Sequence, residues 1–354
     1  MSEVGPESIK EYYIAYFDIL GYKAFFKETP EKADDFLNKI HSIITNTKRQ
    51  IQAVNDFPLA AYDGNICFYA KVFSDNILLC LEVGNDSSKE KARIISFMGV
   101  VAEIQRNIII EYGVFLRGGF AKGKLSINDN YVFGQGLVGV VQMEESTFYP
   151  RIAVSKELVA FLEENMLYSQ EDLDKALLIE NRINDGKCVS DKEKEFYLQM
   201  QNNVKRDLLE KDLIRNLLYK YDDGEWCLSY LYFVGIHSYI PEQTVQAMTD
   251  IIEKQFPSDK VNIPHFIIDI DHILGIHKNV VEKNLMKYSD YASLEIDDIS
   301  RFEGQERVLK KYVWAMVYHN YICARYNKPE FYIDSVGNCE RRHMKLVINV
   351  LGKN

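Results

Sequence analysis

The chain lacks an excess of basic residues, and this absence limits its possible partners. It has 42 Lys and Arg against 52 Asp and Glu in 354 residues, which gives a net charge of −10. General nucleic-acid binders are usually basic, so we expect no nucleic-acid partner. An anionic substrate held through metal ions stays open, because bound cations are often the largest local charges in a site.

Long apolar runs and a secretion signal are also missing. The longest apolar stretch, residues 228–240, is too short and too interrupted to span a bilayer. The opening "MSEVGPESIKE" lacks the basic and apolar regions of a signal peptide. We therefore expect a cytoplasmic protein that does not associate with membranes.

Metal-binding and redox spacings of cysteine and histidine are absent too. None of the six cysteines forms a C-x-x-C pair, and Cys67 and Cys80 lie in apolar, strand-like runs. This pattern predicts buried free thiols in a reducing compartment. His272 and His277, five residues apart, are the only histidines near a ligand spacing, and no G-x-x-x-x-G-K-[ST] phosphate loop occurs.

The segments that are present predict a β-α-β-β-α-β order in the first part of the chain. The spacing of apolar residues predicts four strands and two helices. The strands are expected at residues 12–22, 65–73, 76–83 and 114–125, and the helices over about 30–54 and 87–112. This order predicts an α+β fold with a ferredoxin-like, split βαβ core. Further on, residues 131–146 read as a short strand entering a helix, and 149–155 as another strand.

We place a catalytic domain at residues 8–164. Residues 165–354 are expected to form a mainly helical insertion and C-terminal extension packed on that core. Between 165 and 220 the chain is rich in charged and amide side chains at helical spacing. The aromatic residues Trp314, Tyr318 and Tyr321, also at helical spacing, are expected to be core or dimer packing.

Two aspartates stand at neighbouring strand ends of the predicted sheet. Asp18 ends the first strand, and Asp75 lies at the turn of the 65–83 hairpin. Asp75 has a simple explanation in turn chemistry, because Asp caps its own turns. The alternative is that both carboxylates bind divalent cations, since Mg²⁺ prefers one or two carboxylates together with substrate phosphates.

Five short motifs, in this order, resemble the class III nucleotidyl cyclases, and more closely the bacterial Pycsar antiphage cyclases. They are "FDILGY" (17–22), "FSDN" (73–76), "RGGFAKGKL" (117–125), "YVFGQGLVGVVQMEES" (131–146) and "YPRIAVS" (149–155). The later "KKYVWAMVYHN" (310–320) fits the same subfamily. The resemblance covers residues 12–155 well and the remainder loosely.

The resemblance implies a class III cyclase core with a helical C-terminal elaboration and a uridylate cyclase activity. Such an enzyme converts UTP into 3′,5′-cyclic UMP and pyrophosphate with two Mn²⁺ or Mg²⁺ ions per site. Asp18 and Asp75 match the metal-binding aspartates, and the carbonyl of Ile19 would add a ligand. Backbone amides near Leu20, Gly21 and Tyr22 would contact phosphate, although Gly21 is equally explained by a turn after the strand.

The resemblance also implies a homodimer, with metals held by one subunit and other contacts made by its partner. The product would act on a separate cyclic-nucleotide-sensing effector in antiphage defence.

Base recognition is implied at Lys71 and Val132. Lys71 stands where purine cyclases of this class contact the base, and Val132 replaces the Asp that accepts from the adenine amine. Lys offers only donors, which suits uracil acceptors better than the cytosine amine. A solvated hairpin lysine is the plain alternative for Lys71.

One departure bears on catalysis. Val138 and Gln142 stand where the family carries an Asn that orients the ribose and an Arg that stabilises the transition state. Gln142 carries no charge, so another cation must replace that Arg, or the protein is inactive. The candidates are Arg117, Lys122, Lys124 and Arg151, of which Arg117 is favoured for its place at a strand end beside two glycines. A surface position is the alternative for Arg151.

Three other functions stay open at this stage. The first is a cytidylate cyclase that makes cyclic CMP. The second is a degenerate cyclase-like module that binds nucleotide without turnover. The third is a polymerase-type palm, which shares paired carboxylates on a split βαβ core.

Overall fold

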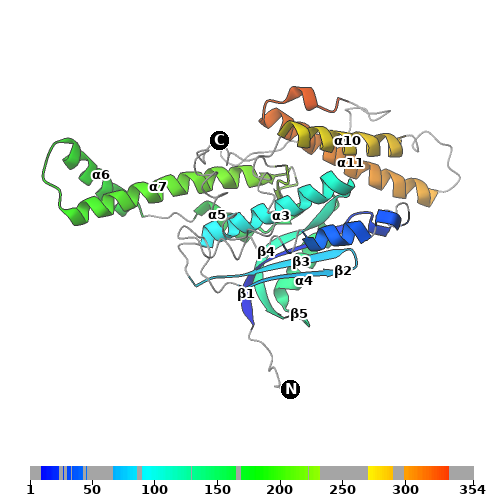
Figure 1. Cartoon of the computed structure of the whole chain (residues 1–354), viewed down its shortest axis with the longest axis horizontal. Helices are drawn as coiled ribbons and strands as arrows, with labels where there is room; N and C mark the ends of the chain where they lie inside the picture. Colours follow the sequence, from blue (N-terminus) through cyan, green and yellow to red (C-terminus); the bar gives the residue numbers. More distant parts are fainter. Residues whose placement is uncertain are drawn as a thin grey trace, which may run out of the picture.

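The protein has a mixed α+β architecture built on one eight-stranded mixed sheet (Figure 1). The computed structural model describes residues 9–23, 27, 30–32, 34–42, 45, 67–85, 90–128, 130–164, 169–221, 223–231, 270–289 and 299–334. The strands are β1 (Lys10–Ile19), β2 (Phe68–Phe73), β3 (Asn76–Glu82), β4 (Leu116–Ile127), β5 (Val132–Phe133), β6 (Ile152–Val154), β7 (Leu218–Lys220) and β8 (Trp226–Leu228).

The strand order is β2-β3-β1-β4-β6-β8-β7, and β5 pairs with β4 beside this path. Neighbours among the first four strands of the order are antiparallel, whereas β6 runs parallel to β4. β1 is therefore an inner strand, and the hairpin of β2 and β3 lies directly next to it, as the sequence predicts. A helix over residues 34–42 stands between β1 and β2, within the predicted 30–54 segment.

β1 is buried on both faces, which explains its nearly unbroken apolar sequence. Phe17, Ala15 and Tyr13 belong to the main hydrophobic core, on the face covered by α3 (Glu90–Tyr112). Tyr16 and Ile14 alternate with them and belong to a smaller cluster under α4 (Gln135–Ser146). Because side chains alternate along a strand, the face that carries Tyr16 also carries Asp18.

Several predicted boundaries agree with the structure, and one differs. α3 ends at Tyr112, where Gly113 takes a φ of +66°, a conformation that suits glycine after a helix. β1 ends at Ile19 rather than at residue 22, because the chain turns at Gly21 with a φ of +77°. The predicted start of α3, at residues 87–89, lies outside the described residues.

The second half of the chain contributes helices and also two strands. The helices after α4 are α5 (Lys156–Glu164), α6 (Gln170–Asn184), α7 (Asp191–Leu217), α10 (Ile270–Ser289) and α11 (Ile299–Arg325), with short 3₁₀ turns at Pro30–Lys32 and Pro329–Phe331. β7 and β8 extend the sheet beyond β6, which the mainly helical prediction for this segment did not include. These strands have three residues each, too few to show an alternating pattern.

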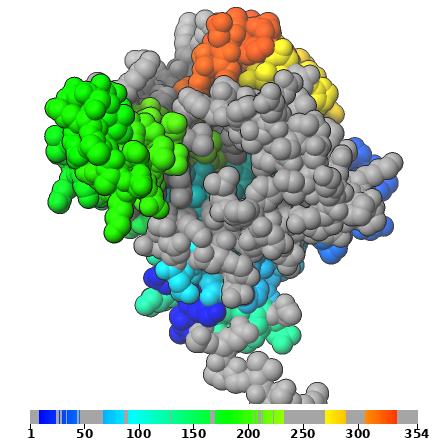
Figure 2. Space-filling model, turned by 60° about the vertical axis from the view of Figure 1, so that its left-hand side comes forward, coloured from blue at the N-terminus to red at the C-terminus, as the bar shows by residue number. Residues whose placement is uncertain are grey.

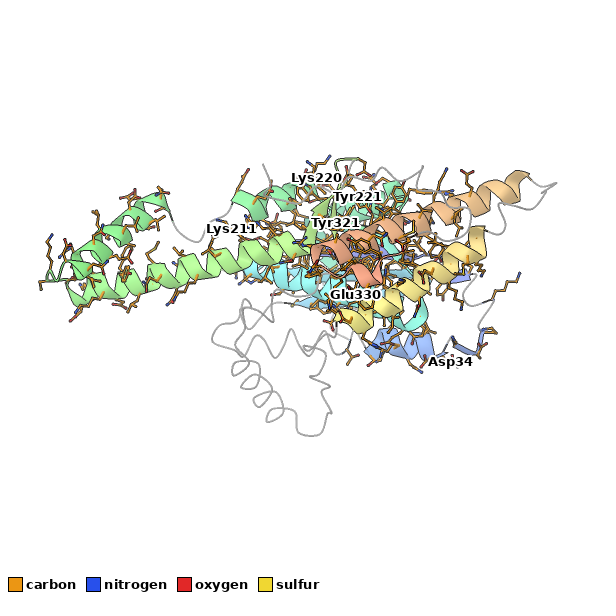
Figure 3. The ribbon with its side chains drawn as sticks, turned by 90° about the horizontal axis from the view of Figure 1, so that it is seen from above. Asp34, Lys211, Lys220, Tyr221, Tyr321 and Glu330 are labelled. Atoms are coloured by element: carbon orange, nitrogen blue, oxygen red, sulfur yellow. The ribbon has the colours of Figure 1, made fainter. Side chains whose placement is uncertain are left out.

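The two helical pairs occupy different parts of the molecule. α6 and the first part of α7 project past Lys211, away from the sheet (Figures 2 and 3). α10 and α11 lie side by side at another edge and enclose a second hydrophobic core with β7 and β8. Trp314 and Tyr318 are fully buried in this core, as expected from their spacing.

Two findings bear on the expectations about thiols and membranes. Cys80, Cys227 and Cys323 are free and buried, whereas Cys67 and Cys188 are free and exposed. Burial was therefore wrongly predicted for Cys67, which stands just before β2, and for Cys188, which lies between α6 and α7. Among the described residues, no helix combines the length and apolar character needed to cross a bilayer.

Candidate active site

The candidate site lies where the ends of β1, β3 and β4 meet. Asp18 on β1 is directly opposite Asn76 on β3 and Arg117 on β4, so the three side chains share one row on one face of the sheet. The amide of Ile19 donates to the carbonyl oxygen of Asp75 at 2.8 Å. The antiparallel pairing therefore brings the two predicted aspartates to the same sheet end.

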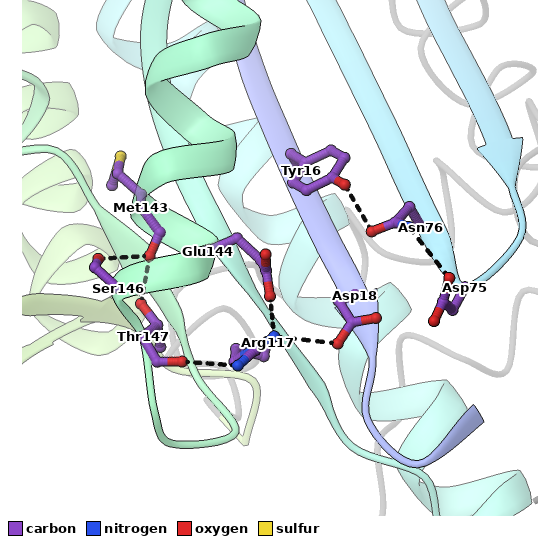
Figure 4. Close-up of polar contacts among 9 residues, drawn as sticks. All are labelled: Tyr16, Asp18, Asp75, Asn76, Arg117, Met143, Glu144, Ser146 and Thr147. Carbon is purple, nitrogen blue, oxygen red and sulfur yellow. Dashed lines mark hydrogen bonds and ion pairs between the residues drawn. The ribbon is translucent and has the colours of Figure 1, made fainter. Parts of the chain in front are cut away.

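Arg117 connects Asp18 to α4 (Figure 4). Its Nη2 lies 3.4 Å from Asp18 Oδ2 and forms a closer ion pair with Glu144. Its Nη1 donates to the carbonyl oxygen of Thr147 at 3.3 Å. Arg117 is thus held mainly by the end of α4, and Asp18 is its more distant carboxylate.

Asp75 lies at the hairpin turn with its own set of contacts. Asn76 Nδ2 donates to Asp75 Oδ1 at 3.2 Å, and Asn76 Oδ1 accepts from the Tyr16 hydroxyl at 2.7 Å. Ser74 precedes it with a φ of +58°. Asp75 therefore stands in the turn between β2 and β3, and its carboxylate lies beside that of Asp18 (Figure 4).

Electrostatics couples the residues of this group. Burial raises the pKa of the Asp18 carboxyl, Asp75 raises it further, and Arg117 and Lys311 oppose the shift. Burial likewise raises the pKa of Glu144, against the effect of Arg117. Asp18 and Asp75 thus repel each other in a partly desolvated place, a repulsion that a bound cation would relieve.

The donor set fits a hard divalent cation. Asp18 and Asp75 offer carboxylate oxygens, and the Asp18 side chain keeps 18% of its surface exposed and thus open to a ligand. In the part of the chain that the structure describes, no group of three or more His, Cys, Asp or Glu side chains gathers as metal ligands. The protein supplies two carboxylate ligands here. This number matches sites where Mg²⁺ keeps waters and substrate phosphates as its other ligands.

Glycines allow α4 to lie close enough for Glu144 to reach Arg117. A Cβ added at Gly119 would lie 2.6 Å from Met143 Cβ and 2.8 Å from the Val140 carbonyl oxygen. A Cβ added at Gly123 would lie 2.5 Å from Gly136 Cα. The "RGG" and "GQG" segments therefore permit close packing between helix and sheet.

The other predicted cations lie elsewhere. Lys122 and Lys124 point to the opposite face of β4 from Arg117, because they stand an odd number of residues away. Arg151 is buried, with its Nη2 2.5 Å from Asp223 Oδ2 and its guanidinium 4.7 Å from the Tyr221 ring centre. The surface alternative for Arg151 is wrong, and its guanidinium packs on Tyr221 and Tyr149 of the second hydrophobic core.

The predicted base contacts share the Asp18 face, but only Val132 lies at the other end of the sheet. Lys71 pairs with Leu78 on β3, two residues along that strand from Asn76, the partner of Asp18. Val132 pairs with Ile127, the last residue of β4, whereas Arg117 is near its start. After β1, the Leu20 amide donates to the Phe115 carbonyl oxygen at 2.9 Å, and Gly21 forms the turn that leads to Tyr22.

Two residues of the group were missed by sequence reasoning. Glu144 follows buried Val140 by four residues on α4, which was the available signal for an inward-facing acid. Lys311 comes from α11, outside the predicted catalytic segment, and no local pattern connects it to Asp18.

Comparison with known proteins adds no assignment. No protein-family model matches the chain, and no curated protein matches it.

Proposed function

We propose that the chain is a metal-dependent pyrimidine nucleotide cyclase that converts UTP into 3′,5′-cyclic UMP and pyrophosphate. The observation that carries this proposal is the placement of Asp18 and Asp75 at adjoining strand ends, joined through the Ile19–Asp75 backbone hydrogen bond. The antiparallel order β2-β3-β1-β4, with helices between β1 and β2 and between β3 and β4, supports the class III cyclase core.

Asp18 and Asp75, with the Ile19 carbonyl, would hold Mn²⁺ or Mg²⁺. When bound, such ions lower the pKa of a hydroxyl nucleophile and stabilise a leaving phosphate. In the reaction, the ribose O3′ forms a bond to the α-phosphorus, the bond from that phosphorus to the bridging oxygen breaks, and the hydroxyl proton passes to solvent. The protein's own task is to orient the triphosphate and to stabilise its charge.

The choice of base rests on Lys71 and Val132. Lys71 donates and suits the carbonyl acceptors of uracil, whereas apolar Val132 offers nothing to an exocyclic amine. Cyclic CMP from CTP is the alternative product.

A homodimer fits the separation of Val132 from Asp18 along β4. If one subunit contacts the base and the other holds the metals, Val132 and Asp18 need not be neighbours within one chain. Phe133 on β5 and Val138 on α4 are 72% and 55% exposed, which supports a second copy covering this side of the sheet. The cytoplasmic role in antiphage defence, through a separate cyclic-nucleotide effector, rests on the resemblance.

The test is to incubate the purified chain with each of the four ribonucleoside triphosphates and Mn²⁺, and to identify products by mass. We expect a cyclic monophosphate from UTP. A cyclic product from CTP alone would keep the reaction and overturn the base assignment. Linear or elongated products would indicate a polymerase-type palm.

Asp75→Ala should abolish product formation while the folded state remains. Asp34→Ala is the matched control, because Asp34 is an exposed aspartate in the helix over residues 34–42. If Asp75→Ala forms product at the wild-type rate, Asp75 is a turn residue only.

A nucleotide-binding module without turnover is the second candidate. The observation that favours it is the ion pair between Arg117 and Glu144, which neutralises the cation expected to replace the missing Arg. Binding of UTP without any cyclic product, in a folded protein, would select this candidate.

A further inference from the structure

Two cations of α11 gather beside the Arg117 group. The Arg307 guanidinium carbon lies 5.5 Å from the centre of the Phe148 ring, and Lys311 Nζ lies 5.9 Å from it. Phe148 directly follows Thr147, whose carbonyl oxygen accepts from Arg117. Three cationic side chains from β4 and α11 therefore surround one short segment at the end of α4.

The register of α11 is fixed by aromatic packing further along the same helix face. Arg307, Lys311, Trp314 and Tyr318 follow at steps of four, three and four residues, which places them in one row. Trp314 stacks on Tyr221 with ring centres 5.4 Å apart. The Tyr318 hydroxyl lies 2.9 Å from Ser229 Oγ and accepts from the Leu231 amide at 2.9 Å.

The two cations of α11 differ from Arg117 in their ion pairing. Among the described residues, no carboxylate forms an ion pair with Arg307 or Lys311, and Arg117 is already paired with Glu144. The pKa of Lys311 is lowered first by burial and then by Arg117 and Arg307. Asp18 and Glu144 act on Lys311 in the opposite direction, so it lies within electrostatic range of the candidate site. An anionic ligand would offset the mutual repulsion of these cations.

We propose that Arg307 and Lys311 of α11, beside Phe148 and Arg117, form a binding subsite for the triphosphate of the substrate and the pyrophosphate product. This inference rests on the proposed function for the identity of the ligand, and it assigns α11 a direct part in the site. Condensed phosphates fit because their adjacent anionic groups can contact several cations at once.

Lys310 provides a matched control within the same helix. It neighbours Lys311 but is 60% exposed and pairs with Glu306 at 2.9 Å. Lys311→Met removes the charge and keeps most of the stem, Lys310→Met does the same on the outer face, and Lys311→Arg keeps the charge. Arg307→Gln is a second test at an exposed position, where a substitution is tolerated by the fold.

The experiment measures binding of inorganic tripolyphosphate to the full chain by titration calorimetry, without divalent metal. We expect Lys311→Met to weaken binding by about 10- to 100-fold and Arg307→Gln to weaken it by a similar or smaller factor. Lys310→Met and Lys311→Arg should bind nearly as wild type. Circular dichroism and thermal unfolding establish that each variant is folded. If Lys311→Met does not fold, the binding measurement on Arg307→Gln tests the subsite instead.

Other outcomes overturn the subsite. They are no tripolyphosphate binding by the wild type, equal weakening by Lys310→Met and Lys311→Met, or unchanged binding in both Lys311→Met and Arg307→Gln. UTP turnover is measured separately on the same proteins. Binding that depends on Lys311 without any cyclic product would retain the anion subsite and reject the cyclase, so the two failures are distinguishable.

Discussion

Arg117 has two carboxylate neighbours, and Glu144 is the one that it holds more closely. Glu144→Gln should destabilise the protein, because Arg117 would keep its charge in a partly buried place with only Asp18 left as an anionic partner. We expect the free energy of unfolding to fall by about 2–4 kcal/mol, measured by urea denaturation. Glu145→Gln, at the exposed neighbouring position, should change it by less than about 0.5 kcal/mol. Equal effects of both variants would contradict the proposed importance of the pair.

Gly119 sets the distance between α4 and the sheet. In Gly119→Ala the new Cβ would meet the Val140 backbone and Met143, so α4 must move outward. We expect a loss of about 1–3 kcal/mol in unfolding free energy. Gly139→Ala is the control on the same helix, because a Cβ there meets no atom within 4 Å. It should raise stability by about 0.5–1 kcal/mol through its higher helix propensity. A tolerated Gly119→Ala would show that α4 can shift without cost.

At the scale of elements, α10 and α11 are joined by a buried pair of histidines. His319 Nε2 lies 2.9 Å from the Phe331 carbonyl oxygen, and its Nδ1 lies 3.1 Å from His277 Nδ1. His277 Nε2 lies 3.1 Å from the Tyr230 hydroxyl. Because a carbonyl only accepts, His319 donates from Nε2. With both rings neutral, the state that burial favours, His277 donates from Nδ1 to His319 Nδ1, and the Tyr230 hydroxyl donates to His277 Nε2.

The histidine pair predicts acid sensitivity. Burial lowers the pKa of His319 to about 4, with Lys278 adding to the shift, and burial also lowers the pKa of His277. The unfolded chain therefore binds more protons than the folded protein between the ordinary value of 6.5 and about 4. Stability from this pair is present above pH 6.5 and is lost as the pH falls, with His319 alone accounting for about 3 kcal/mol.

Urea denaturation at pH 7.5, 6, 5 and 4 measures this dependence. His319→Gln should lower stability at pH 7.5 and flatten its pH dependence, whereas His272→Gln, at an exposed position on α10, should leave the pH dependence unchanged. If the stability of the wild type changes with pH in parallel with that of His319→Gln, His319 is not a source of the acid sensitivity.

Local patterns predicted the elements that are long and regular. β1, the β2–β3 hairpin, α3 and β4 follow from apolar periodicity, and the neighbouring positions of Asp18 and Asp75 follow from the pairing of those strands. Glu144 and Lys311 could not be found in this way, because their approach to Asp18 depends on how α4 and α11 pack. The α4 packing rests on glycines at 119, 123 and 136, and that of α11 on the aromatic stack around Trp314.

For the molecule as a whole, the second half of the chain contributes to the candidate site. Phe115 precedes β4, and its carbonyl oxygen accepts a hydrogen bond from the Leu20 amide. Its ring packs against His277 of α10 and Tyr312 of α11. The turn after Asp18 is therefore linked through Phe115 to α11, the helix that carries Arg307 and Lys311. Removing α10 and α11 would expose the second hydrophobic core and take away two cations at once. α11 is thus part of the environment of Asp18.

The proposed dimer makes a prediction about two inactive variants mixed together. Asp18→Ala removes a metal ligand, and Lys71→Ala removes the proposed base contact. Random mixing of the two variants makes half of the dimers heterodimers. If the two residues act in one site from opposite subunits, one of the two sites in each heterodimer contains neither substitution. Refolding the variants together should then restore about a quarter of wild-type cyclic UMP formation, with each variant alone near zero. A mixture no more active than its components would show that each chain holds a complete site, and full activity of Lys71→Ala alone would remove Lys71 from it.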